Sequence, residues 1–242
     1  MAHSMKVGRS RTAEIAPTSE RHMARKRKPD LSGTDEARER RAKEVPVARG
    51  HFPPELHDGF EIHEWKHASA ILKHDFPNEW NDLLEFLREF KLRKSWIEVG
   101  GKNKSKLSKW IDQFLGQRGW IEKQFETAVV VDANKIESPT HKVDCYKNGI
   151  AFEVEWNNKD PFFDRDLNNF RLLFELRTVS VGIIFTRCDE LQKVFDELGR
   201  GKSYGNSTTH ISKLLPRIAG GGGGGCPLIA IGIRRKLYLE NE

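Results

Sequence analysis

Three carboxylates lie close together in residues 143–163, VDCYKNGIAFEVEWNNKDPFF. Asp144, Glu153 and Glu155 stand among Val, Ile, Ala and Phe, where an ionised acid is costly to bury. A hard divalent cation such as Mg²⁺ prefers oxygen ligands and offsets the repulsion between neighbouring acids. The pattern therefore indicates either a metal site or a solvated polar face of a strand pair.

A tight turn brings two of these acids together. Asn148-Gly149 is a strong signal for a two-residue hairpin loop, because a type I′ turn needs positive φ at both central residues. This register sets Asp144 opposite Glu153, with Cβ atoms about 4.5–5.5 Å apart. The backbone carbonyl of Val154 lies between the acids in sequence and is a further candidate oxygen ligand.

Alternation along the two predicted strands sorts their side chains onto two faces. The apolar face is expected to hold Val143, Cys145, Phe152 and Val154. The polar face is expected to hold Lys142, Asp144, Glu153 and Glu155. In this arrangement Lys142 is placed to neutralise Glu155 or to polarise a water molecule.

The elements around the hairpin predict a mixed sheet covered by helices. Apolar residues at helical spacing predict a helix over 77–92 and a second helix that is capped by Ser105 and ends near Gly116 or Gly119. The first strong strand is expected at 127–132. Beyond the hairpin we expect a helix, a central strand, a helix and a last strand at 164–177, 179–187, 189–199 and 226–240. This order belongs to the α/β (α+β) class, with a mixed central β-sheet flanked by helices.

Charge divides the chain into two parts. Residues 1–50 hold thirteen Lys and Arg against seven Asp and Glu, which accounts for the whole net charge of +6. We expect a basic, disordered tail there. A single domain is expected over 51–242, with a helical part at 70–118 and a catalytic sheet core at 127–235. No membrane span or secretion signal is evident, so a cytoplasmic location is expected.

The spacing Asp-x8-Glu-x-Glu after a hairpin resembles the catalytic core of the PD-(D/E)xK nucleases, in which a second acid can replace the usual lysine. The longer segment 141–232, beginning HKVDCYKNGIAFEVEWNNKDPFF, is similar to the BglII/BstYI family of type II restriction endonucleases. The similarity extends more weakly over about 70–235. It implies a restriction-endonuclease-like fold.

The resemblance also implies roles for the acids. Asp144 and the Val154 carbonyl would hold a metal ion, and Glu153 would hold or orient a water bound to it. Glu155 takes the place of the family's lysine or glutamine, so metal binding, base catalysis and shaping of the water network all stay open for it. The implied reaction is Mg²⁺-dependent hydrolysis of phosphodiester bonds in double-stranded DNA, with Mn²⁺ as a possible substitute.

Three polar segments are candidate DNA contacts. Segment 157–160 follows the catalytic strand, and its side chain types can pair with base edges or simply form a turn and a helix cap. The polar loop 203–210 and the lysines of 100–106 are the other two. The candidate DNA-binding residues are Asn157, Asn158, Lys159, Asp160, Lys102, Lys104, Ser207, Thr208, Thr209 and His210.

Two short patterns point elsewhere and are set aside. HEWKH at 63–67 matches a zinc protease motif, but no third ligand follows at a telling spacing, and the start of a surface helix is expected there. The run Gly220–Gly225 lacks the Gly-Lys-Ser/Thr of a phosphate-binding loop, so no nucleotide cofactor is expected. The run is interpreted as a flexible link or a close backbone approach to DNA.

Together these features predict a type II restriction endonuclease that acts as a homodimer on a short palindromic site, because two-fold DNA matches a two-fold protein. The helices 77–92 and 164–177 are candidate dimer interfaces. Two alternatives stay open at this point. One is a DNA-binding module without catalysis, and the other is a nuclease that depends on DNA structure or modification.

Overall fold

A six-stranded mixed sheet forms the centre of the protein. The computed structural model describes residues 44–98, 104–205 and 207–240. The strands, in their order across the sheet, are β1 (Phe60–Trp65), β9 (Leu228–Ile233), β8 (Val181–Arg187), β7 (Ile150–Val154), β6 (Val143–Lys147) and β3 (Ile121–Lys123). The inner strands β7, β8 and β9 run parallel, and the outer pairings are antiparallel. The predicted mixed sheet with a central strand at 179–187 is confirmed.

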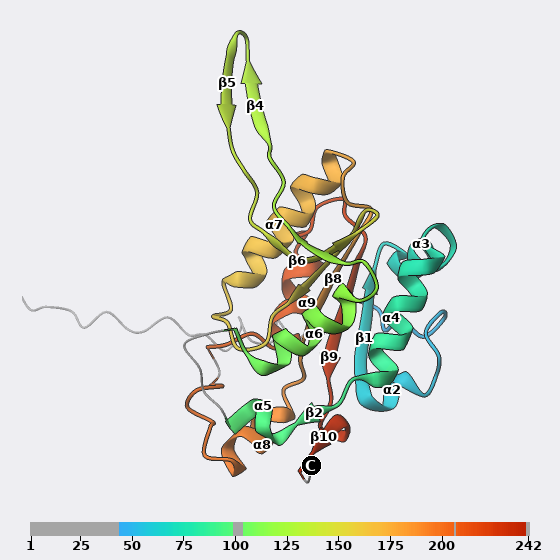
Figure 1. The fold of residues 1–242 in the computed structure, drawn as a ribbon, viewed down its shortest axis with the longest axis vertical. Coiled ribbons are helices and arrows are strands. Elements are labelled where there is room, and N and C mark those ends of the chain that lie inside the picture. The colour runs from blue at the N-terminus through green and yellow to red at the C-terminus, as the bar shows by residue number, and fades with distance from the viewer. Residues whose placement is uncertain (1–43, 99–103, 206, 241–242) are drawn as a thin grey trace, which may run out of the picture.

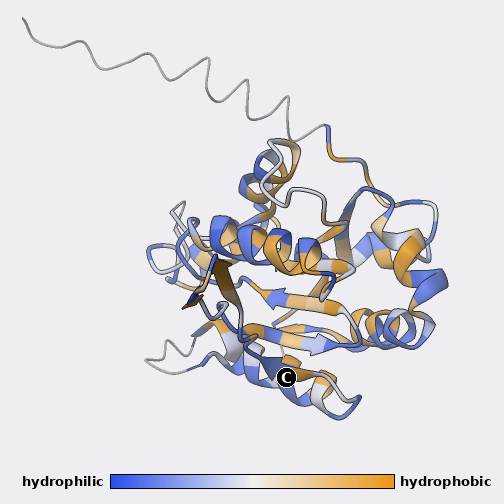
Figure 2. Ribbon diagram, turned by 90° about the horizontal axis from the view of Figure 1, so that it is seen from above, coloured by the Kyte–Doolittle hydropathy of each residue, from blue (hydrophilic) through white to orange (hydrophobic). Residues whose placement is uncertain are grey.

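Helices cover both faces of this sheet. The helices α7 (Phe162–Glu175) and α9 (Ile211–Ala219) pack on one face, around Phe163, Phe170 and Leu214. The other face carries α2 (Leu56–Gly59), α3 (Ala68–Asp75), α4 (Pro77–Glu89), α6 (Lys106–Gly116) and α8 (Leu191–Glu197). The hydrophobic strands therefore lie between two helical layers, as Figure 2 shows. No helix of the described part of the chain is long and apolar enough to cross a membrane.

Smaller elements complete the structure. They are β2 (Leu92–Arg93), α5 (Lys94–Glu98), the 3₁₀ helix at Arg235–Leu237 and β10 (Tyr238–Leu239). Strand β10 pairs with β2. The predicted helix at 77–92 and the helix predicted after Ser105 correspond to α4 and α6. Ser105 caps α6 as expected, since its side chain accepts a hydrogen bond from the backbone N–H of Ser108 at 3.0 Å.

The predicted strand at 127–132 forms, but outside the central sheet. Strand β4 (Ala128–Val131) pairs only with β5 (Asn134–Glu137), and the two make a ribbon that projects from the body (Figure 1). Val130 is 66% exposed, and its valine neighbours are little less so. The apolar residues of β4 thus form a strand that does not belong to the core. The spacing and composition of a segment do not reveal what packs against it.

The helix expected at HEWKH starts only at the end of this segment: residues 63–65 belong to β1, and His67 is the N-cap of α3. His63 lies in strand β1 and is buried, whereas His67 lies in an exposed turn with φ of 56°. His63 Nδ1 lies 2.9 Å from the carbonyl oxygen of Val45, and Nε2 lies 2.9 Å from Glu61 Oε1. The two histidines therefore do not share a helix face, and the zinc-protease pattern has no structural basis.

The glycine run packs against helix α7 and strand β9. A Cβ at Gly223 would lie 2.5 Å from Leu228 Cδ1. Gly224 has φ of +57°, and a Cβ there would lie 2.6 Å from Arg171 Cγ. The sequence analysis expected a flexible link or a close approach to DNA, whereas the run approaches the protein's own helix α7, which side chains in the run would push away from the sheet.

The close packing of helix α7 on the sheet can be tested at Gly182 of strand β8. A Cβ at Gly182 would lie 2.4 Å from a ring carbon of Phe170 in α7 and 2.9 Å from Leu228. We expect Gly182→Ala to lower the free energy of unfolding by about 1–3 kcal/mol, because both neighbours are core side chains without room to move. Urea denaturation measures the change.

Gly116→Ala serves as the matched control. No atom lies within 4 Å of a Cβ at Gly116, the last residue of α6. The control is expected to keep or slightly raise stability. Equal stability of Gly182→Ala and wild type would show that α7 is free to shift outward.

Candidate active site

The hairpin of β6 and β7 has the predicted register. Lys147 pairs with Ile150, and Asn148 and Gly149 have φ of 46° and 86°, as a type I′ loop requires. Extending this register places Asp144 beside Glu153. The turn sequence therefore determines which acids meet.

The predicted apolar face of the hairpin is wrong at Val143. Val143 does not join Cys145 and Phe152 but packs on the α7 side of the sheet. The reason is a bulge in β6: Ile121 pairs with Tyr146 and Lys123 with Val143, so three steps of β6 match two of β3. The extra residue rotates the start of β6, as bulges beside active sites commonly do.

The carboxylates of Asp144 and Glu153 each accept a hydrogen bond from a backbone N–H of the neighbouring strand. The N–H of Asp144 donates to Glu153 Oε2 at 3.2 Å. The N–H of Val154 donates to Asp144 Oδ2 at 3.0 Å. Both carboxylates are therefore held in place by main-chain donors, with Glu153 only 1% exposed and Asp144 half-buried.

Glu155 has a different cation from the one expected. Arg165 of α7 donates to Glu155 Oε1 at 3.2 Å, and the side-chain amide of Asn158 donates to Glu155 Oε2 at 2.9 Å. Lys142 does not neutralise Glu155. It forms an ion pair with Glu122 of β3, at 2.9 Å.

Helix α7 adds two residues that the sequence analysis did not identify. Asp166 is fully buried, and Arg165 Nε donates to Asp166 Oδ1 at 2.9 Å. The signal for Asp166 was available. It lies in the buried stripe of α7 between Phe163 and Phe170, where an acid needs a partner. Arg165 packs over the Phe162 ring at 4.4 Å.

Burial raises the pKa of every acid in this cluster. For Asp144 and Asp166 it is the largest cause of a raised pKa. Burial, followed by the charges on Asp166 and Asp144, raises the pKa of Glu153 well above its usual range. Burial and the neighbouring Asp166 raise the pKa of Glu155 to about 9. Burial thus favours the neutral form of each acid in the metal-free protein, although Arg165 pairs with Glu155 and Asp166.

Unpartnered oxygens mark where a cation would fit. Glu153 Oε1 and Asp166 Oδ2 are buried without a hydrogen-bond partner among the described residues. Over the same residues no group of three or more His, Cys, Asp or Glu side chains is already arranged around a metal position. The donor set is all oxygen, which suits a hard divalent ion.

The first candidate DNA-binding segment, 157–160, has both exposed side chains and side chains that are paired within the protein. Asn157 and Lys159 are exposed. Asn158 is turned toward Glu155, and Asp160 Oδ2 lies 3.4 Å from Lys213 Nζ and 3.7 Å from Arg217 Nη2 in α9.

The second segment lies beside the first. Ser207 is exposed and accepts a hydrogen bond from Lys159 Nζ at 3.3 Å. Thr208 and Thr209 are buried, and His210 Nδ1 lies 2.7 Å from Asp189 Oδ1. All these residues have polar partners within the protein.

The lysines of the third segment are placed only in part. Lys104 is exposed and pairs with Asp112 at 2.7 Å, close enough to Asp144 to favour its charged form. Lys102 lies outside the described residues.

Glu155 makes the stability of the metal-free protein depend on pH. Between its ordinary pKa of 4.5 and about 9, the folded protein holds a proton that the unfolded chain has released. The free energy of unfolding in chelator should therefore fall as pH rises through this window. We expect Glu155→Gln to flatten the decline by up to about 1.4 kcal/mol per pH unit, measured by urea denaturation from pH 5 to 9.

Glu137→Gln on the exposed ribbon is the control for this pH experiment. Its side chain is 78% exposed, so the slope should match that of wild type. Identical slopes for Glu155→Gln and wild type would mean that Glu155 folds in its ionised form.

Comparison with known proteins gives the family. No curated protein matches the chain. A family model described as Restriction endonuclease BglII/BglIII matches residues 60–233, which span the sheet from β1 to β9 and include the whole acid cluster. The chain therefore belongs to the BglII/BglIII restriction endonuclease family, and it is a type II restriction endonuclease, a hydrolase that cuts DNA at specific sites.

Proposed function

We propose that this enzyme cuts both strands of a short palindromic duplex site with Mg²⁺, and that Asp144, Glu153 and Glu155 carry the reaction. The observation that carries the proposal is the buried acid cluster at the end of the β6–β7 hairpin. Buried acids with raised pKa values and unpartnered oxygens cost stability, which is the arrangement expected where function requires them.

The metal would be held by Asp144, Glu153 and the carbonyl of Val154. In an extended strand the N–H and C=O of one residue point the same way. The Val154 N–H is directed to Asp144, so its carbonyl faces the same side. When bound, Mg²⁺ would supply positive charge for the phosphate oxygens and lower the pKa of a coordinated water. Mn²⁺ has the same preference for oxygen ligands and is the natural substitute.

The protein's own residues would then position the scissile phosphate. The Arg165 guanidinium pairs with Glu155, and its side chain is 32% exposed, so it can reach a phosphate while it stays paired. Burial and the neighbouring Asp166 raise the pKa of Glu155 to about 9, which favours its protonated form in the metal-free protein. Asn158 keeps the Glu155 carboxylate oriented toward the cluster.

DNA recognition would use the exposed side chains around this cluster. Asn157, Lys159 and Ser207 face outward from the two polar segments. A palindromic duplex presents the same groups to two copies of one protein related by a two-fold axis, which favours a homodimer. Each copy would then cut one strand.

The proposal is tested by digestion of unmethylated plasmid and viral DNA with Mg²⁺, with Ca²⁺ and with chelator. Wild type is expected to give discrete fragments with Mg²⁺ alone. Asp144→Asn and Glu153→Ala should each lower cleavage about a hundredfold or more, because charge stabilisation by the metal is worth several kcal/mol. Sequencing the fragment ends identifies the site.

Other digestion patterns would contradict the proposal. Cutting that appears only on modified or branched DNA would show a modification- or structure-dependent nuclease. Equal cleavage by wild type and Asp144→Asn would place the chemistry on other residues.

Metal binding can be measured without DNA. At saturating Mg²⁺ or Ca²⁺, about a hundred times the dissociation constant, wild type should gain about 2–3 kcal/mol of stability. Asp144→Asn should lose this gain. Its stability in chelator should equal or exceed that of wild type, because the variant removes a buried acid whose pKa is raised. Thermal melting with and without metal gives both quantities. An asparagine variant that melts well below wild type in chelator would make Asp144 a structural residue.

A further inference from the structure

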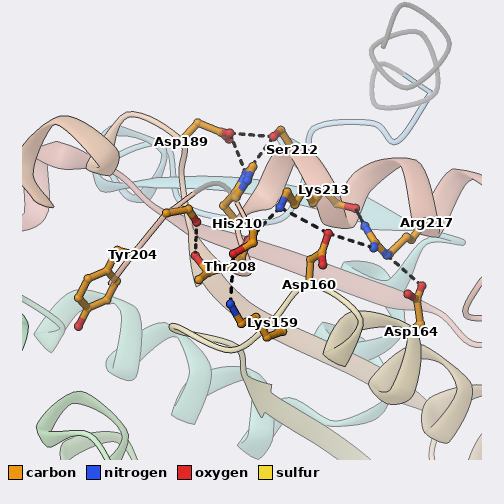
Figure 3. A network of polar contacts seen from close by, with 12 residues as sticks. Lys159, Asp160, Asp164, Asp189, Tyr204, Thr208, His210, Ser212, Lys213 and Arg217 are labelled. Carbon is orange, nitrogen blue, oxygen red and sulfur yellow. Dashed lines mark hydrogen bonds and ion pairs between the residues drawn. The ribbon is translucent and has the colours of Figure 1, made fainter. Parts of the chain in front are cut away.

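The two polar segments form one short ladder. Lys159 and Thr208 make an antiparallel bridge, the N–H of Asp160 donates to the Ser207 carbonyl at 3.2 Å, and the N–H of Thr209 donates to the Asn158 carbonyl at 2.9 Å. Figure 3 shows Lys159 and Asp160 beside the chain that leads to helix α9. Segments about fifty residues apart in sequence thus make a single unit, which we call the reading ladder (158–160 with 207–209).

The reading ladder is held at both sides by buried or partly buried cations. Arg187 at the end of β8 is 1% exposed and donates through Nη2 to Thr208 Oγ1 at 3.1 Å. On the α9 side, Asp160 lies between Lys213 and Arg217, as Figure 3 shows. These contacts leave the ladder little freedom to move independently of the sheet.

Thr209 joins the reading ladder to the catalytic strand. Its side chain is fully buried, and its hydroxyl donates to the backbone carbonyl of Glu155 at 3.1 Å. The N–H of Glu155 donates to the Phe185 carbonyl at 2.9 Å. The side chain of Thr209 therefore fixes the backbone of Glu155 at the end of β7.

We infer that Thr209 is a positioning residue that couples reading of the DNA to cleavage through the backbone of Glu155. The inference rests on the proposed function and extends it to the regulation of the same site. Lys159 and Ser207 are exposed side chains of the ladder and contact the DNA. A DNA site with a mismatched base pair displaces them. The Thr209 hydroxyl transmits that displacement to Glu155, which moves the carboxylate away from Arg165. A correct site leaves this hydrogen bond and the acid in place.

The test compares Thr209→Val with Thr209→Ser. Valine keeps the shape and removes the hydroxyl, and serine keeps the hydroxyl. We expect valine to lower the single-turnover cleavage rate at the cognate site about tenfold, the cost of one buried hydrogen bond, while binding in Ca²⁺ changes little. The ratio of cognate to single-mismatch cleavage should fall as well. Serine should restore both quantities.

Thr140→Val is the matched control for loss of a buried threonine hydrogen bond. Thr140 is 5% exposed, and its hydroxyl accepts from the N–H of Phe125 at 3.0 Å, outside the reading ladder. It should lose stability comparably and keep the cleavage rate and mismatch ratio. If the valine variant at 209 does not fold, Thr209→Ala is compared with Thr209→Ser by the same readouts.

Three results would overturn the inference. Wild-type cleavage by Thr209→Val with an unchanged mismatch ratio would show that Thr209 does not couple the ladder to Glu155. Equal losses in Thr140→Val would assign the effect to stability. A wild-type protein that binds duplex DNA without cutting would overturn the proposed function and the inference with it, which separates that failure from the other two.

Discussion

The repulsion among buried acids is the constraint on which the rest of the site depends. Asp144, Glu153, Glu155 and Asp166 come together at one end of the sheet, and burial opposes the charge on each. Main-chain N–H groups and one guanidinium offset part of that cost. The two-residue turn, the bulge and the helix that lies over the hairpin can all be understood as the means of keeping these groups together.

Local sequence signals were enough for the hairpin and for the helices α4, α6, α7 and α8, but not for α9, which lies where only a polar loop was expected. Asn148-Gly149 defines the loop because its backbone geometry is restricted, and Ser105 caps a helix because its hydroxyl meets orphan N–H groups. Strand order could not be derived in the same way. The valines of β4 have the composition of a core strand, yet they are exposed, because burial depends on neighbours that one segment does not encode.

The site was predictable only where its residues are neighbours in sequence. Asp144, Glu153 and Glu155 belong to one hairpin, so their spacing shows their proximity. Arg165 and Asp166 reach the same place from a helix, through a packing angle that spacing does not reveal. The bulge in β6 was invisible for a similar reason, since it appears only in the pairing with β3.

The six glycines have a consequence beyond their own loop. They allow helix α7 to lie almost in contact with the backbone before β9, and α7 carries Arg165 and Asp166. Gly223 lies against Leu228 and Gly224 against Arg171, and of these two glycines Gly224 has a left-handed backbone. Insertion or deletion of one residue in this run would move each glycine away from its neighbouring side chain and change the distance between α7 and the sheet. A stretch with no functional group of its own thereby helps to place Arg165 and Asp166 beside the acids of the hairpin.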